Sequence, residues 1–302
     1  MSFITKPLVL ATAVSALALA GCGGDSSSSS DDEKARLSVG MTDAPIDTAL
    51  AVYVQFSAIT LIKADGDEED AESQRTITFD EPVKINLLDY QHGKVYPLLE
   101  DEEIDAGEYS QIRLMVDTEL NSDTYIELND GSTFELTISS GAQTGLKLVN
   151  GFTATAGEEV SFTLDFDLRK SITVTGTGEF KLRPTIRIID NLLAGHIGGT
   201  VAANTCAADD ALAVYIYEGE VENPDDLGSE DEPLATASVD TDLSYQASFL
   251  SAGTYTAALT CMADEDDPEV DDDAFGEGEG FVAVSTVITV EADATAEWNP
   301  GE

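Results

Sequence analysis

Apolar and polar residues alternate with a period of two along much of the chain. Residues 52–56, 112–116 and 160–166 place valine, isoleucine, leucine or phenylalanine at every second position. Residues 212–217 and 282–290 are similarly rich in β-forming side chains. Successive side chains of a strand point to opposite faces of a sheet, so this pattern predicts half-buried strands. No long segment has a helical period. We therefore predict an all-β protein made of two consecutive antiparallel β-sandwich domains.

The first residues follow another pattern. Lys6 precedes fourteen uncharged residues, 7–20, which lead into Leu19-Ala20-Gly21-Cys22 and then a run of serines. A helix of fourteen residues would be about 21 Å long, shorter than the roughly 30 Å hydrocarbon core of a bilayer, which indicates a removable signal peptide. The segment resembles a bacterial lipoprotein signal. The alternative is an ordinary signal peptide with a chance cysteine.

The lipoprotein resemblance implies that Cys22 becomes the acylated first residue after cleavage of residues 1–21. Two acyl chains give stable anchoring in a lipid bilayer. In the sorting rule of enteric-type bacteria an aspartate after the cysteine favours the inner membrane, and Gly23 therefore implies the outer membrane. Residues 22–34 are rich in Gly, Ser and Asp and are predicted to be a flexible tether.

Two further cysteines, Cys206 and Cys261, remain once Cys22 is assigned to lipid. An even remainder in an exported protein favours a disulfide, and both residues are expected on strand segments of one domain. Two buried free thiols are the alternative.

Charge divides the chain near residues 191–198. The net charge is −45, and all 14 basic residues lie at or before Arg187. Residues 194–302 contain 26 acidic residues and no Lys or Arg. We therefore predict domains at 35–193 and 194–302. Such a negative protein is not expected to bind nucleic acid or anionic headgroups, but divalent cations and basic partners are compatible with it, as is a salty environment.

Several short motifs occur in order over residues 35–192. They are Met41 to Asp47, Ile85 to Leu88, Ala106 to Leu114, Asp165 to Ser171 and Lys181 to Pro184. In these motifs the first domain resembles domain-of-unknown-function family 4382, which occurs in bacterial lipoproteins and implies no activity. Residues 196–201 and 250–255 resemble the carboxypeptidase regulatory-like, transthyretin-related sandwiches. That resemblance implies a spacer or adhesion-type module.

One motif occurs in both domains. Gly107 and Gly253 each precede a tyrosine by two residues, Tyr109 and Tyr255. We expect the glycine to adopt the positive φ of a tight turn and the tyrosine to lay its ring on the core with its hydroxyl in water.

Paired carboxylates are the candidate chemistry of the first domain. Asp43 and Asp47 flank Pro45, and Asp165 and Asp167 share one face of a predicted strand. Such pairs serve glycosidases or bind metals. The alternative is a structural role: pairing with an arginine, for which the candidates are Arg113, Arg169 and Arg183, and turn capping through Asx-type hydrogen bonds.

The second domain contains an acidic segment in which eight of the ten residues 264–273 are Asp or Glu. Calcium takes six to eight oxygen ligands, and the candidates are Asp264, Asp266, Asp271 and Asp273. The EF-hand pattern is incomplete because Val282 occupies the position of its closing glutamate. The alternative is a solvated hairpin loop. The two histidines, His92 and His196, are too far apart in sequence to indicate a zinc site.

These observations favour a non-enzymatic envelope lipoprotein without a required cofactor, which binds an envelope protein or glycan or serves a structural role. Two alternatives remain open: a glycan hydrolase that uses a carboxylate pair, and a calcium-stabilised adhesin-like module.

Overall fold

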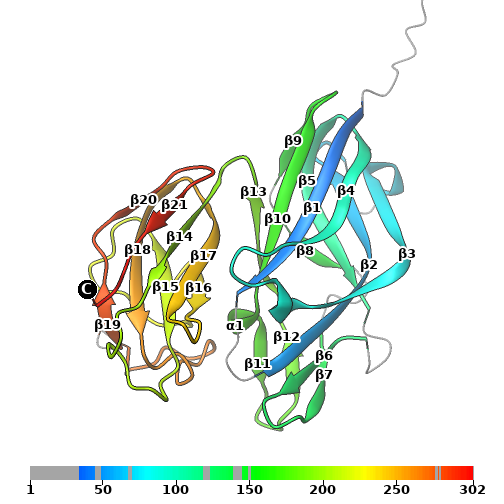
Figure 1. Ribbon diagram of the computed structural model, residues 1–302. Helices are drawn as coiled ribbons and strands as arrows, with labels where there is room; N and C mark the ends of the chain where they lie inside the picture. Colours follow the sequence, from blue (N-terminus) through cyan, green and yellow to red (C-terminus); the bar gives the residue numbers. More distant parts are fainter. Residues whose placement is uncertain are drawn as a thin grey trace, which may run out of the picture. The chain divides into compact units, whose positions relative to one another are not determined.

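The computed structural model describes residues 34–44, 49–66, 70–117, 123–138, 145–148, 151–275, 278 and 280–301 (Figure 1). Cys22, Gly23 and the serine-rich segment lie outside these residues, so their assignment stays a prediction. Within the described part of the chain, no helix is long and apolar enough to cross a membrane.

The strands between Lys34 and Asp190 form two sheets that enclose one core. The first sheet has the order β13-β10-β1-β4: β1 (Lys34–Ala44), β4 (Tyr96–Asp105), β10 (Glu159–Asp167) and β13 (Thr185–Asp190). The second sheet has the order β11-β12-β7-β6-β2-β5-β8, with β3 on β2 and β9 on β5: β2 (Ala49–Lys63), β3 (Gln74–Asn86), β5 (Gly107–Val116), β6 (Tyr125–Leu128), β7 (Thr133–Thr137), β8 (Leu146–Leu148), β9 (Phe152–Ala154), β11 (Ile172–Val174) and β12 (Phe180–Leu182). The alternating residues predicted to face inward, among them Phe56, Ile112 and Phe166, are buried in this core.

The strands between Ala194 and Glu297 form a second pair of sheets. One has the order β17-β14-β21: β14 (Ala194–Thr200), β17 (Ser244–Ser251) and β21 (Thr295–Glu297). The other has the order β16-β15-β18-β19 with β20 on β18: β15 (Ala213–Glu218), β16 (Ala235–Ser238), β18 (Gly253–Thr260), β19 (Phe281–Val284) and β20 (Ile288–Val290). Ile197, Val214 and Leu259 belong to the core of this second group. The all-β sandwich prediction is confirmed.

Three of the four sheets described above are mixed, whereas the sequence pattern predicts antiparallel ones; the β16-β15-β18-β19 sheet is antiparallel throughout. Parallel pairs are β1 with β10, β7 with β12, and β14 with β21. A parallel pair needs a long crossover connection, and the strands β2 to β9 provide it between β1 and β10. Alternation within one strand contains no information on the direction of its neighbour.

The repeated tyrosines occupy equivalent positions in the two halves of the chain. The Tyr109 hydroxyl donates to the Asp105 carbonyl at 2.9 Å, and the Tyr255 hydroxyl donates to the Ser251 carbonyl at 2.7 Å. Both rings are buried, so the hydroxyls hold the preceding turn instead of facing water. Gly107 has φ +151°, while Gly253 does not adopt a positive φ.

Candidate functional site

The two carboxylates at the end of β10 already have structural partners. Asp165 accepts hydrogen bonds from Arg187, with 3.1 Å between Nε and Oδ2. Arg187 lies directly opposite Asp165 in the β10–β13 register. It is not one of the three arginines that the sequence suggested as partners. Asp167 accepts a bond of 3.1 Å from the Lys170 backbone N–H and thereby caps the short helix α1 (Leu168–Ser171). The two carboxylates therefore have structural roles: Asp165 pairs β10 with β13, and Asp167 caps α1.

Asp43 is buried beside these two carboxylates. Burial, followed by the charges of Asp165 and Asp167, raises the pKa of Asp43 well above its ordinary value. A cavity of about 20 Å³ lies against Asp43, Asp165 and Arg187, which is room for a single water molecule. A glycosidase must place a sugar between its two carboxyl groups, and this cavity is too small for one. Asp47, the other member of the pair around Pro45, lies outside the described residues.

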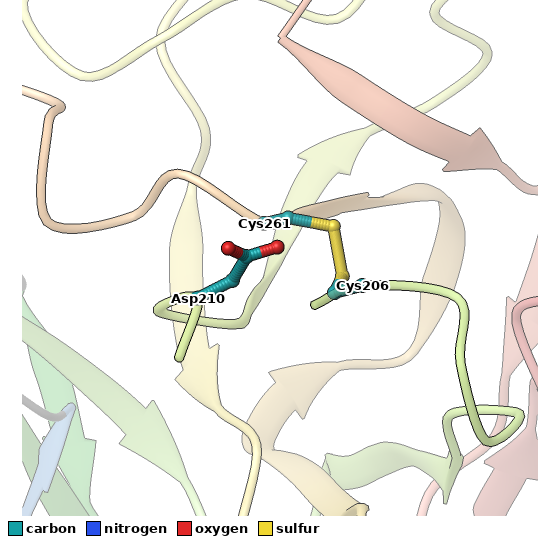
Figure 2. Close-up of side chains that lie close together, drawn as sticks. All are labelled: Cys206, Asp210 and Cys261. Carbon is teal, nitrogen blue, oxygen red and sulfur yellow. A yellow bond between two sulfur atoms is a disulfide. The ribbon is translucent and has the colours of Figure 1, made fainter. Parts of the chain in front are cut away.

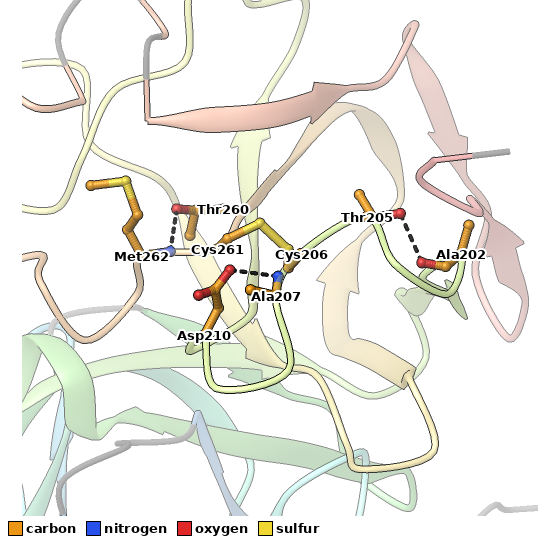
Figure 3. Close-up of a disulfide and its surroundings, with 8 residues drawn as sticks. All are labelled: Ala202, Thr205, Cys206, Ala207, Asp210, Thr260, Cys261 and Met262. Atoms are coloured by element: carbon orange, nitrogen blue, oxygen red, sulfur yellow. Dashed lines mark hydrogen bonds between the residues drawn. A yellow bond between two sulfur atoms is a disulfide. The ribbon is translucent and has the colours of Figure 1, made fainter.

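The predicted disulfide is confirmed. Cys206 and Cys261 are bonded, with 5.7 Å between their Cα atoms (Figure 2). The expectation that both cysteines lie on strands is wrong. Cys206 lies in a bend between β14 and β15, and Cys261 comes directly after β18. Asp210 lies beside them and accepts a 2.7 Å bond from the Ala207 backbone N–H (Figure 3). Disulfide sulfurs are not thiolates, so this trio of Cys206, Asp210 and Cys261 is unsuited to hold a metal.

The acidic segment packs against the outer face of β15. Tyr215 and Tyr217 on that face form a small apolar cluster with Leu227 and Phe275, both of which have no exposed surface. Gly228 has φ +88°, and a Cβ atom there would lie 2.7 Å from the Val270 carbonyl oxygen. Within residues 264–273 only Asp266 is buried and most of the other side chains are exposed, as the alternative of a solvated loop expects, while the buried Phe275 fixes the chain just after the segment.

This cluster brings three carboxylates together: Asp226, Asp266 and Asp272. One oxygen from each lies within 4.8 Å of the others. Asp226 accepts a 2.8 Å bond from the Asp272 backbone N–H, and Asp266 accepts bonds from the Tyr215 hydroxyl and the Leu227 backbone N–H. Burial raises the pKa of Asp226 to about 6 and also raises that of Asp266.

The four calcium candidates from the sequence have different positions. Asp266 belongs to the trio above, and Asp271 belongs to a neighbouring group with Asp225 and Asp226. Asp264 and Asp273 are exposed and lie in neither of these groups. Sequence reasoning missed Asp226 because it lies about 40 residues before the acidic segment; the apolar Leu227 directly after it was the only local signal of burial.

Basic residues of the first sandwich meet the acidic second one within the compact unit of residues 33–302. Arg169 is 5% exposed, and its Nη1 donates to the Ala263 carbonyl at 2.8 Å. Lys170 Nζ lies 3.0 Å from a Glu232 carboxylate oxygen and donates to the Pro233 carbonyl at 2.6 Å. Arg183 Nη1 lies 2.7 Å from a Glu269 carboxylate oxygen. These contacts supply positive charges that the second sandwich itself lacks.

An open cleft of about 790 Å³ runs beside α1. It is lined by two basic residues, Lys170 and Arg187, and by six acidic ones: Glu218, Glu220, Glu222, Glu230, Asp231 and Glu232. Both bases already face a carboxylate, Glu232 and Asp165 respectively. Six negative and two positive charges leave a formal charge of −4, so the cleft attracts cationic groups.

Comparison with known proteins gives one family match. The family model described as "Domain of unknown function (DUF4382)" matches residues 34–184, and no curated protein matches the chain.

Solved structures resemble the chain only remotely. The Bacillus anthracis TIE protein matches at 10% identity and TM-score 0.21 over 88% of this chain and 33% of that protein. This chain therefore spans about a third of the length of the TIE protein. The minor pilin GBS52 of Streptococcus agalactiae matches at 12% identity and TM-score 0.19, over 87% of this chain and 93% of the pilin. The shaft pilin spaA from Lactobacillus rhamnosus GG matches at 11% identity and TM-score 0.21, over 89% and 99%. At these values the likenesses define neither a shared fold nor a shared function.

Proposed function

The chain belongs to the family described as Domain of unknown function (DUF4382), and we propose that it is a non-enzymatic binding module of the bacterial cell envelope. The family description supplies no activity, so the proposal rests on the residues of this chain. It combines a lipid anchor at Cys22 with a ligand surface on the acidic second sandwich.

The observation that carries the binding role is the acidic cleft beside α1. Its six carboxylates exceed its two bases, and both bases have partners within the fold. A cleft lined by one sign of charge concentrates ligands of the opposite sign. The ligand class that fits is a basic segment of an envelope polypeptide. The paired carboxylates Asp165 and Asp167, by contrast, are engaged in the fold.

The anchor explains where such a module would act. Acylation of Cys22 would hold the protein on the outer membrane, and the Gly/Ser/Asp-rich tether would let the two sandwiches reach partners near the surface. The resemblance of the second sandwich to carboxypeptidase regulatory-like modules supports a spacer or adhesion-type role.

The anchor is tested by Cys22→Ser in the native host. The variant should lose incorporation of labelled palmitate and move from the membrane fraction to the soluble fraction. A variant that still pellets with membranes after a salt wash would contradict lipid anchoring.

The cleft is tested with a fluorescent decalysine peptide as the probe. Charge reversal by Glu220→Lys with Glu222→Lys should weaken binding by about tenfold or more at low salt, since each reversed charge removes an attraction on the order of 1 kcal/mol. Glu291→Lys with Glu297→Lys is the matched control, because these exposed residues do not line the cleft. Equal loss of affinity in both variants would mean that only net charge attracts the peptide.

A further inference from the structure

Two buried carboxylates in the second sandwich each have an oxygen without a hydrogen-bond donor. Asp226 is 0% exposed and Asp266 is 8% exposed. The Oδ1 atom of each has no partner among the described residues, although the Oδ2 atoms accept bonds. A buried carboxylate oxygen without a partner is costly, because it has lost its hydration and gained nothing in return. A bound cation would remove this deficit at both residues.

These carboxylates converge with that of Asp272. One oxygen of each lies within 4.8 Å of the others. Oxygens bound to one calcium ion at 2.3–2.6 Å can be at most about 4.6–5.2 Å apart. Three oxygens at the 4.8 Å limit would lie about 2.8 Å from a common centre, so inward shifts of about 0.2 Å suffice for all three to contact a single ion. We propose that Asp226, Asp266 and Asp272 form a binding site for a divalent cation of the calcium type.

The charge of the site matches such an ion. The three carboxylates contribute −3, and the buried guanidinium of Arg169, which attracts Asp266, contributes +1. The formal sum is −2, which one divalent cation neutralises. A monovalent ion would leave a buried negative charge, and a further arginine could not enter the space between the three oxygens.

The surroundings hold the carboxylates in place before any ion binds. The Tyr215 hydroxyl and the Leu227 backbone N–H fix Asp266 through its Oδ2. The Asp272 backbone N–H fixes Asp226, and the Asp267 backbone N–H donates to Asp272 at 3.0 Å. Preorganised ligands reduce the entropy cost of binding.

The donor set selects calcium over other common cations. All three ligands are carboxylates, whereas zinc prefers sulfur and nitrogen ligands. Magnesium demands a near-ideal octahedron at 2.0–2.1 Å, while calcium accepts six to eight oxygens in irregular geometry. Asp225 and Asp271 form a separate group around Asp226, and water molecules, which calcium accepts as ligands, can complete the oxygen shell. Neither Asp264 nor Asp273 is needed.

The experiment uses the full chain after treatment with a chelator. Calcium chloride, magnesium chloride and sodium chloride at matched ionic strength are compared by calorimetric titration and by thermal unfolding. Calcium should bind with a dissociation constant on the order of 10⁻⁴ M, within the range of extracellular calcium modules, and should raise Tm above either other salt. Equal Tm shifts for the three salts, or no heat of calcium binding, would overturn the proposal.

Variants locate the site. Asp226→Asn with Asp266→Asn should weaken calcium binding at least about tenfold, since each replaced carboxylate removes a charged ligand. Asp264→Asn with Asp273→Asn is the matched control, with the same change of charge at two exposed positions of the same segment. The control should bind calcium as the unchanged chain does. Similar losses in both double variants would leave only a diffuse acidic surface and refute the site.

Because Asp226→Asn with Asp266→Asn alters buried residues and could disturb folding, a second variant at a less buried position tests the same site. Asp272→Asn changes a half-buried residue and should also weaken calcium binding, with an unchanged circular dichroism spectrum. Terbium bound at the site should give tyrosine-sensitised luminescence, because the Tyr215 hydroxyl contacts Asp266. Calcium should displace the terbium. Retained calcium affinity in a folded Asp272→Asn variant, or terbium emission that calcium does not reduce, would count against the site.

Discussion

Replacing Arg169 should reveal how strongly the first sandwich supports the second. The side chain is 5% exposed, donates to the Ala263 carbonyl at 2.8 Å and attracts the buried Asp266 carboxylate. Arg169→Met keeps an apolar stem of similar reach but removes the charge and the donor.

The expected cost follows from these contacts. A hydrogen bond from a charged donor contributes about 1.5–3 kcal/mol. Removing one partner of a buried charge pair costs about 3–5 kcal/mol in total, because the other charge is left uncompensated. We therefore expect Arg169→Met to lower the free energy of unfolding by about 3 kcal/mol or more. Arg183→Met is the control: its pair with Glu269 is more than 40% exposed at both side chains, so the loss should be about 1 kcal/mol or less.

Urea unfolding of the full chain, in the presence of a chelator, measures both losses. Asp266→Asn completes a double-mutant cycle, since the neutral amide no longer needs the guanidinium. The loss caused by Arg169→Met should then shrink by about 1 kcal/mol or more, within the range measured for residues in one network. Strictly additive losses, or equal losses for Arg169→Met and Arg183→Met, would refute the reasoning.

Two other predictions concern the disulfide and a buried acid. The Cys206–Cys261 bond joins residues 55 positions apart in the sequence. In the chain-entropy model, replacing both by Cys206→Ser with Cys261→Ser should therefore lower the free energy of unfolding by about 4 kcal/mol. An unchanged midpoint of urea unfolding would contradict that model for this protein. Burial raises the pKa of Asp43 above 3.8, so the folded chain keeps this proton to higher pH than the unfolded chain does. Stability should therefore fall as pH rises from about 4 through the folded pKa. Asp43→Asn should remove that loss, so the stability of the variant relative to the unchanged chain should be higher at pH 7 than at pH 4. Thermal unfolding of both proteins across this pH range measures the difference. An identical pH profile in both would exclude Asp43 as the cause of the loss.

Local alternation predicted the strands, and the even number of remaining cysteines predicted the disulfide, but neither could predict which surfaces distant segments cover. Alternation in residues 160–166 places Thr163 and Asp165 opposite the core, yet they are 1% and 5% exposed. Asp165 is covered because Arg187 lies on it from the next strand. Likewise, the meeting of Asp226 with Asp266 depends on Leu227 and Phe275 packing on the outer face of β15. Period-two alternation describes one strand and says nothing of such partners.

The motif from Asp165 to Ser171 has a structural role, which is to bring basic side chains of the first sandwich into contact with the second. Asp167 caps α1, and α1 then presents Arg169 and Lys170 to the second sandwich. With Arg183, these residues supply basic groups to a region, 194–302, that has 26 acidic residues and no Lys or Arg.

A fragment of residues 194–302 therefore tests this compensation together with the predicted domain boundary. The fragment should unfold cooperatively by itself. It should also gain more stability from added sodium chloride than the full chain does, because salt then screens repulsion that the three bases otherwise offset. Chemical unfolding at low and high salt measures the gain. Equal salt dependence in the fragment and the full chain would show that these bases do not relieve the repulsion, and a fragment that cannot fold at any salt concentration would show that the two sandwiches are not independent domains.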